Sequence, residues 1–265
     1  VERPGGPSRS AVSNGREAAV FPLDANLGVA GTPQSGTGQT ALLTGADAPA
    51  VFGRHFGPWV PVALRSIVEE ENVLVRALEA GRTAAFANAY PREWRDSRRG
   101  RRLAAPPMAA EAAGLLDRHA EELAAGDALA SEITNDGWRT RLGHADLPTP
   151  TSADAGRALA GIAAQHDLTL FAHYSTDHAG HEGCMEEAVA ALDRVDAFLG
   201  GVLEALPPDA LLLIGSDHGN VEDVSDGHTR NPALGLLAGP HAVDRSRGLE
   251  TIRDVAGAVE GWLGE

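Results

Sequence analysis

The sequence contains no lysine, and all 22 of its basic residues are arginine. A chain without lysine cannot form a Schiff base through an amine side chain. It also cannot supply the lysine that a P-loop places on nucleotide phosphates. Both mechanisms are therefore excluded before any fold is considered.

Cysteine and long apolar runs are also scarce. Cys184 is the only cysteine, so an internal disulfide is excluded and a reducing compartment is favoured. No stretch approaches the roughly 18 apolar residues of a membrane-spanning helix. The opening VERPGGPSRS lacks the charged-then-apolar pattern of a signal peptide. We therefore expect a cytoplasmic protein with no membrane partner.

Acidic residues outnumber basic residues, 37 to 22, which gives a net charge of −15. This balance argues against nonspecific binding to nucleic acid. Hydrophobic residues make up 43% and charged residues 22% of the chain, which is ordinary for a globular protein. A length of 265 residues allows one large domain, or one domain with a small insert. The sequence does not indicate the oligomeric state.

Hydrophobic periodicity predicts strands that alternate with helices. The clearest helix has apolar residues at steps of three and four: Met185, Val189, Leu192, Val195, Leu199, Val202 and Leu206. Strands are expected at 82–90, 168–174, 210–215 and 233–238, and further helices at 36–45, 62–80, 152–166 and 249–263. Such alternation predicts an α/β fold whose mostly parallel sheet has helices on both faces. Residues 1–20 are expected to form a loop.

Residues 91–150 differ from the rest of the chain. They are rich in arginine, hold two short helical patterns and end in the proline-rich DLPTPT. We predict that this segment is a small inserted cap. Residues 1–90 and 151–265 would then form the catalytic core.

Aspartate and histidine gather where two predicted strands end. Asp177, His178 and His181 follow strand 168–174, and Asp217 and His218 follow strand 210–215. In α/β sheets, ligands bind beyond the carboxyl ends of the strands. Imidazole and carboxylate are the ligands of zinc and manganese, and the set exceeds what one tetrahedral ion needs once His228 is added. We therefore expect two divalent ions, although Asp and His also suit turns and helix caps.

The segment SDHGN at 216–220, followed by HTRNP at 228–232, resembles the signature ADHGN…HTxNP of cofactor-independent phosphoglycerate mutases. TDHAGH at 176–181 resembles the D-x-x-G-H segment of the same family. These enzymes, like phosphopentomutases and nucleotide pyrophosphatases, are metalloenzymes of the alkaline phosphatase superfamily. The resemblance implies an alkaline-phosphatase-like fold. It also implies one metal held by Asp177, His181 and His228, and a second held by Asp217, His218 and a serine oxygen.

The nucleophile is expected in TPQSGTGQTALLTG at 32–45. Ser35 precedes a Gly-Thr-Gly turn that opens a predicted helix, and a helix N-terminus suits a phosphate group. The family patterns align their serine or threonine nucleophile with Ser35, and Thr37 is the alternative. The resemblance then implies attack by Ser35 on phosphorus and a phosphoserine intermediate.

One family feature is not found in the sequence. Family members begin with an apolar strand that ends in Asp-Gly, whose aspartate completes the second metal site. Asp24 in FPLDANLG lies close to Ser35 in sequence and is not followed by glycine. We expect this strand to be absent from the chain shown, either because an upstream segment is missing, the favoured explanation, or because the second metal site is degenerate.

The run PREWRDSRRGRR at 91–102 holds six of the 22 arginines. Guanidinium groups bind phosphate through paired hydrogen bonds, so we expect Arg92 and Arg95 to contact a small phosphorylated substrate. The alternative is a solvated loop. His178 is expected to face the substrate or simply to be exposed.

The function predicted from these features is a metal-dependent phosphatase that acts on a small phosphorylated metabolite. Hydrolysis is preferred because an insert of about 60 residues is small beside the inserted domains of the mutases. A phosphomutase is the first alternative. A non-catalytic relative with a degenerate second metal site is the other.

Overall fold

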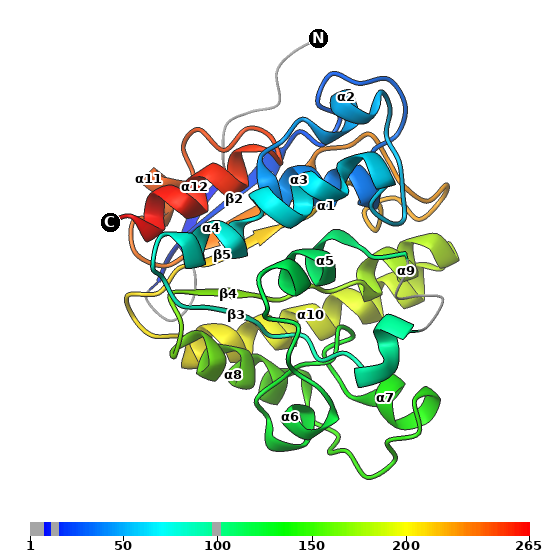
Figure 1. The fold of residues 1–265 in the computed structure, drawn as a ribbon, viewed down its shortest axis with the longest axis vertical. Coiled ribbons are helices and arrows are strands. Elements are labelled where there is room, and N and C mark those ends of the chain that lie inside the picture. The colour runs from blue at the N-terminus through cyan, green and yellow to red at the C-terminus, as the bar shows by residue number, and fades with distance from the viewer. Residues whose placement is uncertain (1–7, 12–15, 97–101) are drawn as a thin grey trace.

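The computed structural model describes residues 8–11, 16–96 and 102–265 (Figure 1). These residues form a mixed α/β structure. Its strands are β1 (Ser8–Ala11), β2 (Glu17–Leu23), β3 (Ala84–Phe86), β4 (Leu168–Leu170), β5 (Leu212–Gly215) and β6 (Ala233–Ala238). Its helices are α1 (Ser35–Thr44), α2 (Ala48–Phe52), η1 (Val62–Leu64), α3 (Arg65–Glu71), α4 (Val73–Glu79), η2 (Arg92–Asp96), α5 (Ala105–Ala112), α6 (Ala120–Ala125), α7 (Asp136–Arg141), α8 (Ser152–Ala163), α9 (Ser175–Glu182), α10 (Met185–Ala205), α11 (Ala242–Arg245) and α12 (Asp254–Leu263).

Helices lie on both sides of the strands. In Figure 1, α1, α4 and α12 lie above them, and α8 and α10 lie below. Side chains of a strand alternate between its two faces, so each face needs its own cover. Leu213 of β5 packs against the core that contains α1 and α12, whereas Leu212 packs against the core between α8 and α10. Strand β5 is therefore covered on both faces, which accounts for its continuous apolar sequence.

The prediction of a mostly parallel sheet is wrong for the described strands. The larger sheet has the order β1-β2-β6-β5, and each neighbouring pair is antiparallel. Among the strands that the structure describes, only β3 and β4 pair in parallel. The physical reason lies between β5 and β6. A helical crossover returns the chain in the same direction, whereas the loop 216–232 lacks a helix and returns it in the opposite direction.

The predicted loop at the beginning of the chain is also wrong. Residues Glu17–Leu23 form β2, which lies between β1 and β6 and ends just before Asp24. Strand β2 is followed by Asp24 and Ala25, so it does not end in the Asp-Gly pair of the expected family strand. Its sequence, EAAVFPL, is rich in alanine and holds Pro22, which is unusual in an internal strand and hides the strand pattern.

Two helical predictions need refinement. The expected helix at 62–80 is divided at Asn72, whose side chain accepts hydrogen bonds from the backbone of Leu74 and Val75 and so begins α4.

Helix α5 lies inside the predicted cap 91–150, yet Ala105 and Met108 pack in the main core with α1 and α12. The division into core and cap stays a prediction.

Among the described helices, none is long and apolar enough to cross a bilayer.

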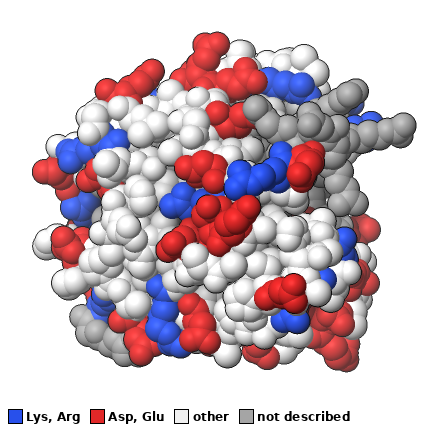
Figure 2. Space-filling view, turned by 60° about the horizontal axis from the view of Figure 1, so that its bottom comes forward, with Lys and Arg blue, Asp and Glu red and all other residues white. Residues whose placement is uncertain are grey.

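On the face that Figure 2 shows, acidic side chains and arginines lie interspersed. Arg157 of α8 pairs with Asp154 and with Glu204 of α10. Opposite charges therefore lie close together on a chain of net charge −15.

Close packing of α8 against α10 depends on glycine. A Cβ atom on Gly156 would lie 2.0 Å from the carbonyl oxygen of Phe198. Gly161 lies on the same helix, and a Cβ atom there would meet nothing within 4 Å. We expect Gly156→Ala to reduce the free energy of unfolding by about 2 kcal/mol or more. Gly161→Ala should raise it by up to about 1 kcal/mol, because alanine favours a helix.

Urea unfolding of both variants measures these changes. Equal stability of the two variants would contradict the packing described for α8 and α10.

Candidate metal centre

Three segments beyond β4 and β5 supply the polar cluster. Helix α9 starts at Ser175, shortly after β4, and carries Asp177 and His181. Strand β5 runs directly into Ser216, Asp217 and His218. The loop from β5 to β6 then returns to the same place with His228, because Thr229 pairs with Gly219 across the loop.

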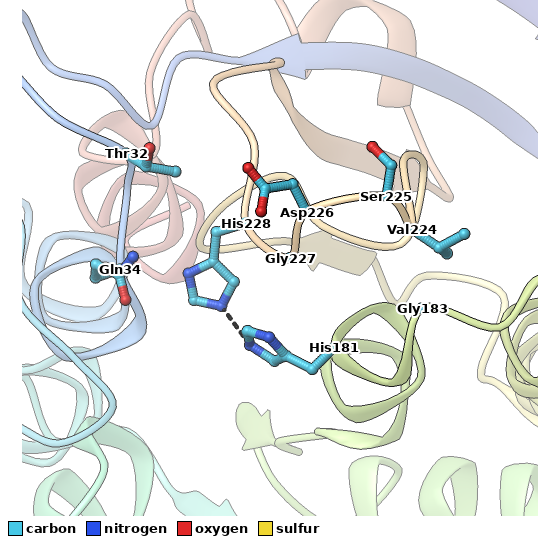
Figure 3. Close-up of a pocket in the computed structure, with 9 residues that line it drawn as sticks. All are labelled: Thr32, Gln34, His181, Gly183, Val224, Ser225, Asp226, Gly227 and His228. Atoms are coloured by element: carbon cyan, nitrogen blue, oxygen red, sulfur yellow. Dashed lines mark hydrogen bonds between the residues drawn. The ribbon is translucent and has the colours of Figure 1, made fainter.

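The donor atoms of these residues converge. Nε2 of His228 lies 3.1 Å from Oδ1 of Asp177, and Nε2 of His218 lies 3.8 Å from the same oxygen. Nε2 of His181 lies 2.9 Å from Nε2 of His228, as Figure 3 shows. Four ligands at about 2.0 Å from a tetrahedral zinc ion lie roughly 3.3 Å from one another. The separations in the cluster are thus close to those of ligands around one ion.

Two features of the cluster fit a divalent cation. Oδ2 of Asp217 is buried and has no hydrogen-bond partner among the described residues. A buried carboxylate oxygen without a partner is costly, and a cation would satisfy it. The facing ring nitrogens of His181 and His228 repel each other unless a proton or a cation lies between them. Within the described ranges, the donor atoms of Asp177, His218 and His228 also lie within 4.8 Å of one another, a spacing suited to a metal.

Electrostatics favour a charged carboxylate at the centre. Burial by itself would raise the pKa of Asp177, but the hydrogen bond from His228 and the charges of His218, His228 and His181 lower it to about 2. Burial of the His228 ring would lower its pKa, yet the hydrogen bond and charge of Asp177 raise it overall. Asp177 is therefore an anion at neutral pH and is available as a metal ligand.

Ser35 adds a hydroxyl group to this cluster. It is the first residue of α1 and is buried, and its Oγ lies 3.0 Å from Nε2 of His218. Two glycines of the same helix allow close approach. A Cβ atom on Gly38 would lie 2.5 Å from the carbonyl oxygen of Asp217, and one on Gly36 would lie 2.1 Å from that of Trp59. Gly38 therefore lets α1 contact the ligand loop, and Gly36 lets it contact the segment that holds Trp59.

Thr37, the alternative nucleophile, is placed differently. Its side chain is fully buried, and its hydroxyl donates to the carbonyl oxygen of Gln34 and accepts from the N–H of Phe56. The hydroxyl is thus occupied in joining α1 to the segment that follows α2.

A network that sequence reasoning missed holds the ligand loops together. Nδ2 of Asn220 donates to Oδ1 of Asp177 at 2.6 Å. The carboxylate of Glu222 accepts from the N–H of Asn220, from the hydroxyl of Thr229 and from Nδ2 of Asn231. Asn220, Thr229 and Asn231 belong to the motifs SDHGN and HTRNP, so their presence in those motifs was the available signal. The network orients Asp177 toward the histidines.

Two cavities open on the cluster. One, of about 540 Å³, is lined by His181 and His228 together with Gln34 and Asp226 (Figure 3). The other, of about 830 Å³, has Ser35, Asp177 and His178 in its wall. The cluster therefore lies between two spaces, and the hydroxyl of Ser35 lines the larger one.

Of the residues predicted to bind substrate, some line the larger cavity and others do not. His178 lines the larger cavity. Arg92 is exposed, pairs with Glu121 at 3.2 Å and lines neither cavity. The side chain of Arg95 lies outside the described part of the chain. Arg102, from the same arginine run, does line the larger cavity and was not singled out from the sequence.

Asp24 directly follows strand β2, and Ala25 comes next in place of the glycine of the family pattern. Its carboxylate accepts hydrogen bonds from the backbone N–H and the side chain of Asn26. It is not one of the three residues whose donor atoms converge in the described ranges. Asp24 thus engages Asn26 rather than the cluster.

Comparisons with known proteins find a family model, curated relatives and a solved structure that match parts of the chain. Residues 149–259 match the family described as "Metalloenzyme superfamily". A 2,3-bisphosphoglycerate-independent phosphoglycerate mutase from Desulforudis audaxviator is 32% identical over 108 residues, which are 38% of this chain and 21% of that protein. A mutase of the same name from Syntrophotalea carbinolica is 36% identical over 101 residues, 35% of this chain and 19% of that protein. This chain therefore spans about a fifth of the length of these curated relatives.

Among solved structures, the PH0037 protein from Pyrococcus horikoshii matches with a TM-score of 0.46 and 16% identity, over 71% of this chain and 44% of that chain. The family match and the mutase relatives confirm the resemblance to the alkaline phosphatase superfamily. The matched segment contains every histidine and aspartate of the cluster.

Metal binding to the cluster should stabilise the fold. A ligand at a hundred times its dissociation constant stabilises the folded state by about 2.7 kcal/mol. We expect Mn²⁺ or Zn²⁺ to raise the melting temperature of chelator-treated protein, and Asp177→Asn to remove most of the rise. Asp193→Asn is the control, because Asp193 is exposed on α10. An equal rise in both variants, or no rise in the unaltered protein, would contradict a metal centre at Asp177.

Proposed function

We propose that this chain, which resembles the alkaline phosphatase superfamily in its residues 149–259, is a metal-dependent phosphoryl-transfer enzyme. The observation that carries the proposal is the position of Ser35. Its Oγ lies at the N-terminus of α1, 3.0 Å from His218, within a cluster of carboxylate and imidazole donors. A hydroxyl group among metal ligands is the arrangement of an activated nucleophile.

The donor set divides between two ions, Mn²⁺ or Zn²⁺. Asp177, His181 and His228 would hold one, and Asp217, His218 and the oxygen of Ser35 would hold the other. Bound metal supplies positive charge that lowers the pKa of a hydroxyl group and stabilises a phosphoryl transition state. Asp217 brings to this site a buried oxygen that lacks a hydrogen-bond partner in the described chain.

The protein itself orients the reaction. Helix α1 begins at Ser35, and the positive end of a helix suits an anionic phosphate. The N–H of Thr37 in this first turn donates to the carbonyl oxygen of Phe56, so the N–H groups of Ser35 and Gly36 are the ones that would face a phosphate.

Asn220 holds Asp177 by a hydrogen bond of 2.6 Å, so the carboxylate keeps its orientation. His178 lines the same cavity as Ser35 and is placed to contact the bound ester.

The acceptor of the phosphoryl group decides between two activities. Hydrolysis was preferred from the sequence because the insert is small. The relatives are phosphoglycerate mutases, and this favours transfer to a second hydroxyl group, as in a phosphomutase. We therefore propose phosphomutase action as the better supported activity and hydrolysis as the alternative.

The third candidate, a non-catalytic relative, rests on the missing Asp-Gly pair of the second metal site. Strand β2 runs up to Asp24, but Ala25 follows that aspartate in place of glycine. The hydrogen bonds between Asp24 and Asn26 are a second observation in favour of this candidate. A small phosphorylated substrate and a cytoplasmic location stay predictions.

Replacement of the nucleophile tests the proposal. We expect Ser35→Ala to abolish phosphoryl transfer from phosphate monoesters in Mn²⁺ while the fold is retained. Thr37→Ser should keep most of the activity, because it preserves the hydroxyl that joins Gln34 and Phe56. Activity is measured both as released phosphate and as isomerised ester, which separates hydrolysis from mutase action.

Full activity of Ser35→Ala would show that Ser35 is not the nucleophile. Full activity of Ser35→Ala together with loss of activity in Thr37→Ala, which removes the hydroxyl that Thr37→Ser keeps, would move the nucleophile to Thr37.

A further inference from the structure

The larger cavity beside Ser35 has an unusual wall. Of its twelve lining residues, four are aromatic: Trp59, Tyr90, Trp94 and Tyr174. The chain has only four tryptophans, and two of them line this one cavity. Aromatic residues make up 5% of the sequence, so they are concentrated here. The volume of about 830 Å³ lies within the range of small-molecule sites.

The aromatic rings are held by contacts with their neighbours. The centroid of Tyr90 lies 4.6 Å from that of Trp94, with the ring planes at 59°. The guanidinium carbon of Arg102 lies 4.6 Å from the ring centroid of Trp59. The backbone of Trp59 is in turn fixed against α1, because Gly36 lets its carbonyl oxygen approach. Trp59 is therefore positioned against the helix that begins at Ser35, and Trp94 packs against Tyr90.

Two buried polar atoms of the same wall belong to residues that line the cavity. Oε1 of Gln39 has no hydrogen-bond partner within the described chain, and the hydroxyl of Tyr174 interacts with the phenol of Tyr90. Burial raises the pKa of Tyr174, which keeps the phenol protonated and able to donate a hydrogen bond. Gln39 lies one turn after Ser35 on α1, on the same side of the helix. A ligand with hydrogen-bonding groups would satisfy Oε1 of Gln39.

The charge of the wall restricts the ligand further. Arg102 is the one cationic side chain among the residues that line this cavity in the described chain. A small aliphatic phosphate with an additional carboxylate would need more positive charge than this. A flat ring needs aromatic surface instead, and this wall supplies it.

We infer that this cavity binds the organic part of the substrate, and that this part is a flat, hydrogen-bonding heteroaromatic ring, as in a nucleoside phosphate. The inference rests on the proposed function only for the phosphate, which would lie at Ser35. The ring would stack on Trp59 and Trp94, and Gln39 and Tyr174 would bind its polar groups or those of the attached sugar. Trp59 and Trp94 are then residues that determine specificity.

Binding of adenosine, which has no phosphate, tests the inference without metal or turnover. Titration of the full chain in chelator should quench tryptophan fluorescence, whereas ribose should not. Base stacking on an aromatic side chain predicts that Trp59→Ala and Trp94→Ala each weaken binding between about fivefold and a hundredfold. Trp59→Phe keeps an aromatic face and should bind much more tightly than Trp59→Ala.

Matched controls test whether the effect is confined to the cavity. Trp262→Ala should bind adenosine as the unaltered protein does, because Trp262 lies on α12 and does not line the cavity. Asp193→Asn should also bind adenosine normally, because Asp193 is exposed on α10 and lies outside the cavity. Circular dichroism of each variant checks that it folds.

Either of two results would overturn the inference. Adenosine that fails to bind the unaltered protein, or that binds the Trp59 and Trp94 alanine variants with unchanged affinity, would exclude a ring-binding cavity. Loss of transfer in Ser35→Ala together with such a result would leave the proposed function standing and reject only the assignment of the substrate class.

Discussion

The structure of the candidate site depends on the convergence of one carboxylate with several imidazole rings. Asp177 lies within 3.8 Å of both His218 and His228, and its pKa falls to about 2 in their presence. Such a group of donors is costly without a proton or a cation to hold it together. The loop between β5 and β6, helix α9 and the glycines of α1 bring these donor atoms together.

The fold meets this requirement by pairing strands in opposite directions. Strand β5 delivers Asp217 and His218, and the return to β6 carries His228 back across the site through the pairing of Gly219 with Thr229. Helix α1 then approaches this loop closely enough that Gly38 has no room for a side chain. Ser35 is placed beside His218 as a result of that approach.

Much of the site could be predicted from the sequence, because short motifs state ligand types and spacing directly. The residues of TDHAGH, SDHGN and HTRNP meet in space, and Ser35 joins them. The direction of the strands could not be predicted in the same way. Apolar runs such as LLLIG show burial on both faces, which parallel and antiparallel neighbours provide equally well. Strand β2 was missed because alanine and Pro22 weaken its pattern, while tertiary pairing with β6 overrides that weakness.

The substrate side of the site was the hardest part to predict. The arginine run drew attention to Arg92 and Arg95, yet Arg92 pairs with Glu121 and Arg102 lines the cavity. The aromatic wall joins residues from positions 59 to 174, and no local pattern connects them. Contacts of that kind appear only once the chain is folded.

The most direct test of the account is a crystal structure of the protein with Mn²⁺, examined by anomalous diffraction. The account predicts two anomalous peaks at metal–ligand distances of roughly 2.0–2.2 Å. One peak should lie among Asp177, His181 and His228, and the other among Asp217, His218 and the oxygen of Ser35. The absence of a peak at these residues, or peaks confined to other carboxylates, would contradict the central claim that this cluster is a metal centre.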